Sequence, residues 1–278
     1  MSAVRGATPG GPPVRDDAGY YATPLGRFIS VTTIISLGVP KPALFHWAAF
    51  EAAQCAVDNI PALVQARGAE ARREMRAWIQ HAAERKRDTA ADLGTLIHAL
   101  LEARILGQPT PPLTEEQTPW VEAFDRFLND WQPKYEATEL TVANPDHGYA
   151  GTLDAIAQIP ALFGDEMVMA DYKTGKNVYP EVGLQLSAYQ RCPIGWTRPA
   201  GIEVTPPPST AGAVIHIRPK HMPNGTIRGY SVRRVLTTDD VYEAFRAAQV
   251  IARHAIKDGL ASKVLSAVIR PPKLEQVA

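Results

Sequence analysis

Two aspartates lie inside short apolar segments, and they restrict the fold of this chain more than any other feature. Asp154 lies within residues 151–156 (GTLDAI), and Asp171 follows the apolar run 168–170. Apolar and β-branched residues bounded by turn residues predict two neighbouring β-strands here. A charge inside an apolar strand needs an opposite charge or a metal ion. We therefore expect a fold that brings both carboxylates to a cationic partner.

The spacing of these residues indicates how they meet. The interval between Asp154 and Asp171 suffices for the rest of one strand, a turn and part of the next, so a hairpin would bring them together. Side chains alternate along a strand, so Asp171 and Lys173 share a face while Tyr172 points away. Carboxylates repel unless a cation lies between them, and Mg²⁺ and Mn²⁺ prefer such oxygens. Asp154, Asp171 and Lys173 are therefore predicted to catalyse metal-assisted phosphodiester hydrolysis.

Lys173 could have more than one catalytic role, and the Asp171-x-Lys173 motif could also be only a structural ion pair. The lysine could orient or deprotonate the attacking water, or offset charge on the phosphate. An isolated Asp-x-Lys on a strand is commonly a solvated ion pair. The apolar residues around Asp154 and Asp171 favour the metal site, and a structural domain with an ion pair at Asp171 and Lys173 remains an alternative.

Two predicted helices carry further candidate residues. His98 lies on a helix expected over 89–106, where apolar residues recur at helical spacing. Imidazole is a ligand for Mn²⁺, although a packed histidine is common on such a helix. Gln185 and Tyr189 are four residues apart on a helix expected over 180–191, so they share one face. They are candidates for phosphate or base contact, or an ordinary surface pair.

The order of the predicted elements indicates the fold class. Helices are expected through 41–131, strands over 139–143, 148–159 and 167–172, then a helix, two strands over 213–217 and 230–235, and a final helix. This order predicts an α/β fold with a mixed central sheet flanked by helices. The expected organisation is a flexible arm at 1–18, a single domain at 19–264 with a helical part at about 40–132 and a sheet core at about 133–260, and a tail at 265–278.

Turn-forming residues predict several boundaries. Pro61 is expected to break the helical region, and the proline-rich stretch 193–210 is expected to be a loop. Residues 30–35 (SVTTII) are expected to form either a short strand or the start of a capped helix. Asn224-Gly225 signals a hairpin between the last two strands, and residues 237–240 are expected to cap the final helix.

The composition restricts the class of protein. Lys plus Arg equals Asp plus Glu at 29 each in 278 residues, which argues against a uniformly basic DNA-coating protein but permits a local basic groove. The two cysteines, Cys55 and Cys192, cannot hold a zinc or iron–sulfur site alone, and they suggest a reducing compartment. We expect a cytoplasmic protein, in the host cytoplasm if phage-encoded, because neither a signal peptide nor a membrane span is visible.

These motifs, in this order, resemble the PD-(D/E)XK nuclease superfamily and more narrowly its RecB-like branch, which includes phage exonucleases. Each motif alone is weak, whereas the ordered set is specific and covers roughly residues 30–189. The matching segments are GTLIHALLE with His98, GTLDAI with Asp154, DYKTGK with Asp171 and Lys173, and QLSAYQ with Gln185 and Tyr189.

The resemblance implies a restriction-endonuclease-like core that cuts DNA, usually as an exonuclease in phage or bacterial recombination, repair or processing. It implies Mg²⁺ or Mn²⁺ and, as a partner besides DNA, a single-strand annealing or recombination protein. The cysteines that hold an iron–sulfur cluster in several relatives are missing, so we predict no cluster. The implied metal ligands are His98, Asp154, Asp171 and the backbone carbonyl of Tyr172, with Lys173 catalytic and Gln185 and Tyr189 positioning DNA.

Basic residues near these motifs are candidates for DNA contact. Lys176 follows the catalytic strand, and Arg218 and Lys220 lie by the predicted hairpin, where they could bind phosphates. Two other functions remain open, a catalytically silent DNA-binding recombination or defence component with the same fold and an RNA-directed nuclease. The sequence leaves strand polarity, exo- or endonuclease action and oligomeric state undecided.

Overall fold

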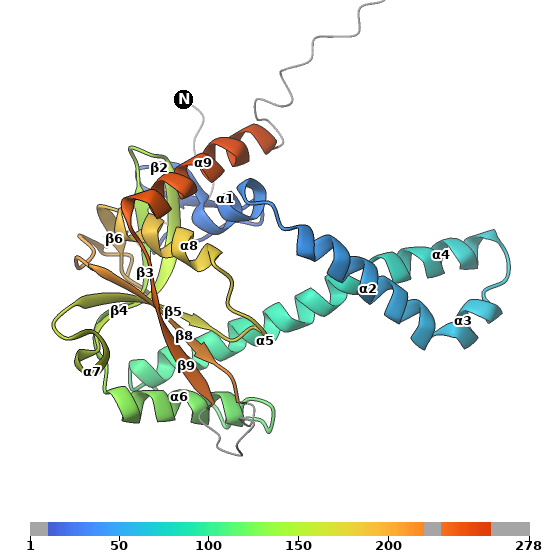
Figure 1. The fold of residues 1–278 in the computed structure, drawn as a ribbon, viewed down its shortest axis with the longest axis horizontal. Coiled ribbons are helices and arrows are strands. Elements are labelled where there is room, and N and C mark those ends of the chain that lie inside the picture. Colours follow the sequence, from blue (N-terminus) through green and yellow to red (C-terminus); the bar gives the residue numbers. More distant parts are fainter. Residues whose placement is uncertain (1–10, 220–228, 257–278) are drawn as a thin grey trace, which may run out of the picture.

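A nine-stranded mixed sheet forms the centre of residues 11–219 and 229–256, the part of the chain that this computed structural model describes (Figure 1). The confirmed fold class is α/β, with helices on both sides of the sheet. The strands are β1 (Tyr20–Thr23), β2 (Gly26–Ser30), β3 (Lys134–Asn144), β4 (Tyr149–Gln158), β5 (Met167–Lys173), β6 (Ile194–Trp196), β7 (Glu203–Val204), β8 (Ala211–Ile217) and β9 (Tyr230–Val235).

The strand order places β4 and β5 in the middle of the sheet. The main path runs β7-β6-β3-β4-β5-β8-β9, and the β1–β2 hairpin joins it where β2 pairs with the start of β4. β5 pairs with β8 in parallel, and β3, β4 and β5 pair antiparallel in succession. The predicted site residues Asp154 and Asp171 therefore belong to neighbouring central strands.

Helices cover both faces of the sheet and bury a separate core on each (Figure 1). On one face, α1 (Val31–Gly38), α8 (Glu181–Gln190) and α9 (Asp239–Ala255) supply buried residues such as Ile34, Leu186 and Phe245. On the other, α5 (Ala82–Ile105) and α6 (Thr118–Trp131) supply Ile97 and Phe124. The short α7 (Pro160–Phe163) links β4 to β5.

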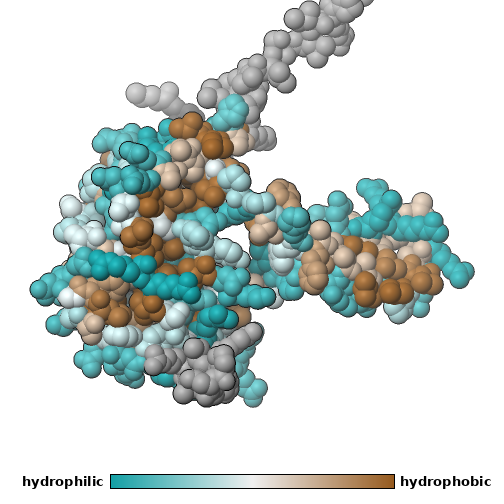
Figure 2. Space-filling view, in the orientation of Figure 1, coloured by the Kyte–Doolittle hydropathy of each residue, from teal (hydrophilic) through white to brown (hydrophobic). Residues whose placement is uncertain are grey.

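The remaining helices form an arm that projects from the sheet (Figure 1). This helical arm comprises α2 (Pro42–Asp58), α3 (Ile60–Gln65), α4 (Ala69–Gln80) and the first turns of α5. None of the described side chains of α2, α3 and α4 is buried. Large apolar side chains such as Phe45 and Val64 are exposed, and hydrophobic residues gather on the arm in Figure 2.

Several boundaries differ from those expected. Ser30 ends β2 and accepts a hydrogen bond from the Thr33 N–H at 3.0 Å, so the capped helix start is correct. The helix break lies at Asn59 and not at Pro61, which is the second residue of α3, where its missing N–H is tolerated. α5 begins at Ala82, earlier than the expected residue 89.

The expected loop at 193–210 contains the short strands β6 and β7, so that prediction is wrong in part. Residues 11–18 are also not the expected flexible arm, because Pro13 is buried and Arg15 forms a β-bridge with Tyr21. Thr238 is the N-cap residue of α9, as expected, but its side chain makes no capping hydrogen bond. The hairpin turn expected at Asn224-Gly225 lies outside the described residues.

Candidate active site

The central strands β4 and β5 diverge at the two aspartates. Their antiparallel register ends at the pair Ala155 and Ala170, so Asp154 and Asp171 are the first residues beyond the paired segment. Beyond this pair the contact between the strands is made by a side chain, since the Tyr172 N–H of β5 donates to Asp154 Oδ2 of β4 at 2.7 Å. The expected antiparallel pairing is confirmed, and it places both aspartates where the sheet opens.

Glu139 lies across from Asp154 on the other neighbouring strand, β3. The residues next to them pair regularly, as Thr138 does with Ala155. Glu139 has φ 46°, in the left-handed region that residues other than glycine rarely adopt. The register continues unchanged at Leu140 and Leu153, although Glu139 and Asp154 are not themselves among the paired residues. Glu139 was absent from the sequence-based candidates.

One imidazole and two carboxylates converge at Glu139 and Asp154. A ligand atom from each of His98, Glu139 and Asp154 lies within 4.8 Å of the other two. His98 projects from α5, and its Nδ1 is 3.9 Å from Asp154 Oδ2. The predicted ligands His98 and Asp154 are thus brought together with Glu139, whereas Asp171 is not a member of this group in the described part of the chain.

The chemistry of these three groups fits a divalent cation. Imidazole nitrogen and carboxylate oxygen together suit Mn²⁺, and the carboxylates suit Mg²⁺. Carboxylates facing each other across two strands repel. Burial, followed by the charges of Asp154 and Glu102, raises the pKa of Glu139 to about 7. A cation held between Glu139 and Asp154 would remove that repulsion.

Asp171 forms a second, adjoining cluster with Lys173 and Gln185. Lys173 Nζ is 2.9 Å from Asp171 Oδ1 and 2.7 Å from Oδ2, and Gln185 Nε2 donates to Oδ1 at 3.1 Å. The Asp171 side chain is only 3% exposed. Apart from this ion-pair contact, Oδ2 has no hydrogen-bond partner within the described residues. The predicted pairing of Asp171 and Lys173 on one face is therefore correct.

The two clusters influence each other through Asp154. Burial raises the pKa of Asp171, the Lys173 ammonium opposes this, and the Asp154 carboxylate adds to it. Burial lowers the pKa of Lys173, but the Asp171 and Asp154 carboxylates outweigh that effect, so the pKa rises. Lys173 is therefore a fixed positive charge beside a pair of carboxylates.

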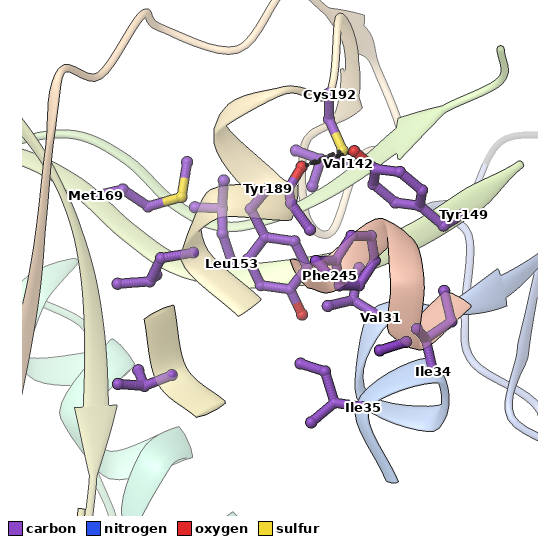
Figure 3. Packing of buried hydrophobic residues seen from close by; sticks show 14 of the residues in the cluster. Val31, Ile34, Ile35, Val142, Tyr149, Leu153, Met169, Tyr189, Cys192 and Phe245 are labelled. Atoms are coloured by element: carbon purple, nitrogen blue, oxygen red, sulfur yellow. Dashed lines mark hydrogen bonds between the residues drawn. The ribbon is translucent and has the colours of Figure 1, made fainter. Parts of the chain in front are cut away.

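Gln185 and Tyr189 have different environments although both lie on α8. Gln185 reaches the site and orients Asp171, as described above. Tyr189 is only 3% exposed, and its ring lies among the core side chains near Leu153 and Phe245 (Figure 3). The ring of Tyr189 is thus enclosed in the core and is not exposed at the site, and its predicted part in positioning DNA stays a prediction. Gly151 makes room for the ring, since a Cβ there would lie 2.3 Å from Tyr189 Cε1.

Tyr172 points away from the site, as the strand alternation predicted. Its ring contacts Phe124 edge-on with centroids 5.3 Å apart, and its hydroxyl shares a hydrogen bond of 2.8 Å with the Tyr135 hydroxyl. Its backbone lies beside the group of His98, Glu139 and Asp154, because its N–H donates to Asp154. The role of its carbonyl as a ligand stays a prediction.

Each of the two clusters lines a hollow of its own. The metal-side hollow, of about 450 Å³, is lined by His98 and Glu102 of α5, Glu139 and Asp154 of the sheet, and Thr174 and Arg198 of two loops. The lysine-side hollow, of about 220 Å³, is lined by Lys173, Gln185, Lys41 and Tyr179, among others. A substrate could therefore reach each cluster through its own hollow.

The predicted DNA-contacting cations lie mainly outside these hollows. Lys176 is exposed on the loop that follows β5, two residues beyond Thr174. Arg218 is exposed immediately after β8, and Lys220 lies outside the described residues. Their contact with DNA remains a prediction, whereas Arg198 and Lys41 are basic residues lining the hollows that sequence reasoning did not select.

A scan against models of known protein families found no match, and a search among curated proteins found no significant match. The helices in the described ranges all lack the combination of length and apolar composition that crossing a bilayer requires.

Proposed function

We propose that this chain is a metal-dependent DNA nuclease of the PD-(D/E)XK type, acting with Mg²⁺ or Mn²⁺. One observation carries the proposal: Asp154 belongs to the His98–Glu139 group and also accepts the N–H of the strand that bears Asp171 and Lys173. Asp154 thus links the group that we propose to bind the metal with the strand that carries the Lys173 ammonium.

The arrangement supports phosphodiester hydrolysis. Water adds its oxygen to phosphorus, one P–O ester bond breaks, and a proton passes to the departing sugar oxygen. A divalent cation held by His98, Glu139 and Asp154 would supply a polarised water and offset charge on the phosphate.

The surrounding residues prepare the site for this reaction. Lys173 provides positive charge for the phosphate oxygens, and its position is fixed by Asp171, which Gln185 orients in turn. The Tyr172 N–H holds the Asp154 carboxylate in one orientation. Because these contacts exist before substrate arrives, little reorganisation is needed during the reaction.

The decisive experiment compares cleavage of linear end-labelled DNA, circular DNA and RNA with Mg²⁺, Mn²⁺ or EDTA. We expect divalent-dependent cleavage of DNA that EDTA abolishes. Lys173→Ala should lower kcat by roughly 100- to 1000-fold, since a preorganised charge at the phosphate is lost. Circular substrate distinguishes exonuclease from endonuclease action.

Lys134→Ala is the matched control, because Lys134 is exposed at the start of β3 and lines neither hollow. Circular dichroism of both variants checks that each is folded. Full activity of Lys173→Ala, or cleavage that persists in EDTA, would contradict the proposal. Cleavage of RNA alone would replace DNA with RNA as the substrate.

A catalytically silent DNA-binding protein is the second candidate. The buried ion pair at Asp171 is compatible with a purely structural role, and this favours testing binding separately from cleavage. DNA binding without cleavage by either metal would support that alternative. As a nuclease acting on genomic or phage DNA, the protein would work in the cytoplasm beside recombination proteins.

A further inference from the structure

Arg198 is a cation at the metal group that neither the motifs nor the proposed chemistry uses. It lies just beyond β6 and lines the metal-side hollow with His98, Glu139 and Asp154. Among the described residues that line this hollow, it is the one with a permanent positive charge. The hollow also contains three carboxylates, from Glu102, Glu139 and Asp154. A phosphate entering it would therefore be repelled everywhere except at Arg198 and at a bound cation.

The backbone around Arg198 is held in place by local hydrogen bonds. The Thr197 N–H donates to the Ile202 carbonyl at 2.9 Å, and the Gly201 N–H donates to the Thr197 carbonyl at 2.8 Å. Strand β6 is itself anchored on both sides, since Trp196 pairs with Thr141 of β3 and with β7. Arg198 is thus presented from a fixed loop, which lowers the entropy lost when it binds a ligand.

The guanidinium of Arg198 is only weakly engaged. Its Nη1 is 4.0 Å from Glu139 Oε2, at the outer limit of an ion pair, and its side chain is 34% exposed. Within the described ranges no other carboxylate lies within 4.0 Å of it. Glu139 is at the same time part of the His98–Asp154 group. If the Glu139 carboxylate binds a cation, the N–H donors of the Arg198 guanidinium can bind another anion.

We propose that Arg198 binds a nucleic-acid phosphodiester adjacent to the one that is cleaved. Guanidinium and phosphate form paired, charge-assisted hydrogen bonds, which suits Arg for a backbone contact. The contact reads the backbone and not the base, so it positions the strand without sequence preference. This inference rests on the proposed function, because it takes nucleic acid as the ligand of the same site.

The test measures binding of short fluorescein-labelled DNA oligonucleotides, single-stranded and duplex, by fluorescence anisotropy with Ca²⁺ as the divalent ion. A series of oligonucleotides carries one uncharged methylphosphonate at successive positions. Wild type, Arg198→Ala and Arg198→Lys are compared. Arg27→Ala is the matched control, since Arg27 is a partly exposed, ion-paired arginine of β2 that lines neither hollow.

We expect Arg198→Ala to bind unmodified DNA roughly 10- to 100-fold more weakly, the range for one hydrogen bond to a charged group. Arg198→Lys should recover part of the loss, and Arg27→Ala should bind like wild type. One methylphosphonate position should weaken wild type but not weaken Arg198→Ala any further. Mn²⁺ affinity, measured by calorimetry, should be unchanged or higher in Arg198→Ala because a positive charge has left the hollow.

Unchanged DNA binding by Arg198→Ala would overturn the inference, as would equal effects of every methylphosphonate on both proteins. Lower Mn²⁺ affinity in Arg198→Ala would also overturn it, since Arg198 would then act by holding Glu139. Cleavage assays separate the two claims. If one methylphosphonate position is coupled to Arg198 but no DNA is cleaved, the phosphate contact of Arg198 stands and the nuclease function is refuted. If DNA is cleaved but no position is coupled to Arg198, the nuclease function stands and the phosphate contact is refuted. Wild type that binds none of the oligonucleotides refutes the phosphate contact.

Discussion

Glu139 is the residue of the site that is under the most strain. Its φ of 46° costs on the order of 1 kcal/mol for a residue with a Cβ. Its carboxylate is partly buried opposite that of Asp154, and this raises its pKa to about 7. Such unfavourable features persist where function requires them, and cation binding is the function that these surroundings favour.

Glu139→Gln tests whether Glu139 binds a cation, because it removes the negative charge and keeps nearly the same side-chain shape. At pH 8, where the native carboxyl is mostly ionised, the variant without metal should unfold at a temperature roughly 1–3 °C higher, because a cross-strand repulsion is removed. Mn²⁺ should then stabilise the variant less than wild type, since one ligand is weakened. Differential scanning calorimetry with and without Mn²⁺ measures both effects.

Glu122→Gln is the control, because Glu122 is an exposed glutamate on α6. It should leave the stabilisation by Mn²⁺ unchanged. Equal Mn²⁺-induced shifts in wild type and Glu139→Gln would show that Glu139 is not a ligand.

At the level of residues, the sequence predicted the parts of the site that lie in apolar surroundings. Asp154, Asp171 and Lys173 were visible because charge inside an apolar strand is unusual. Glu139 was missed because the strand was expected to begin at this residue, whereas β3 begins at Lys134. The burial of Tyr189 was not visible, because helical spacing shows which residues share a face but not what covers that face.

Among the elements, the crossing of α1 and α9 depends on one glycine. A Cβ on Gly38 would lie 2.1 Å from the Ala248 carbonyl oxygen. The two helices therefore lie closer together at residue 38 than a residue with a side chain would permit. Both helices bury side chains in the core on the α8 face of the sheet. Since the obstructing atom is backbone, a side chain at residue 38 must push the helices apart.

Gly38→Ala should therefore destabilise the fold by about 1–3 kcal/mol, the usual cost of overpacking. Chemical denaturation followed by circular dichroism measures the free energy of unfolding. Gly11→Ala serves for comparison, because no heavy atom lies within 4 Å of a Cβ built there. Equal stability of Gly38→Ala and wild type would mean that the helices can separate at no cost.

Long periodic elements were predicted well and short ones poorly. The amphipathic pattern behind α6 and the apolar run behind β5 are strong local signals. β6 and β7 have only 3 and 2 residues, and proline-rich sequence surrounds them, so they exist because β3 offers an open edge to pair with. Such pairing is a tertiary effect that residue types in the segment do not reveal.

For the molecule as a whole, stability is divided unequally between the sheet and the helical arm. The described side chains of α2, α3 and α4 are all at least partly exposed, whereas β4 and β5 are buried between two helical layers. Local opening costs little free energy where few apolar contacts are lost. Hydrogen exchange measured by mass spectrometry should show amides of the arm exchanging on the order of 100-fold or more faster than those of β4 and β5.

Repeating the exchange at two protein concentrations provides the control. Protection of the arm that rises with concentration would indicate self-association through its exposed apolar residues. Strong protection of the arm at every concentration would contradict the expected division of stability.

The order of helices and strands was enough to predict the α/β class, because alternation of the two patterns leaves few architectures. It did not predict that the first helices leave the sheet. Their alanine-rich sequence indicates helix formation, yet it resembles that of helices which pack against a core. Which helices the sheet holds is decided by matching surfaces far apart in the chain.

The length of α5 gives the arm mechanical leverage over the site. Its 24 residues extend for about 36 Å, and its first turns carry Arg85 and Lys86, which contact Trp78 and Glu51 of the arm. His98 lies in its other half. The arm and His98 thus share one continuous helix, so a movement of the arm that bent or rotated α5 as a whole would also move the imidazole relative to Asp154. If His98 holds a cation as proposed, a partner that moved the arm would then also change the geometry of that site.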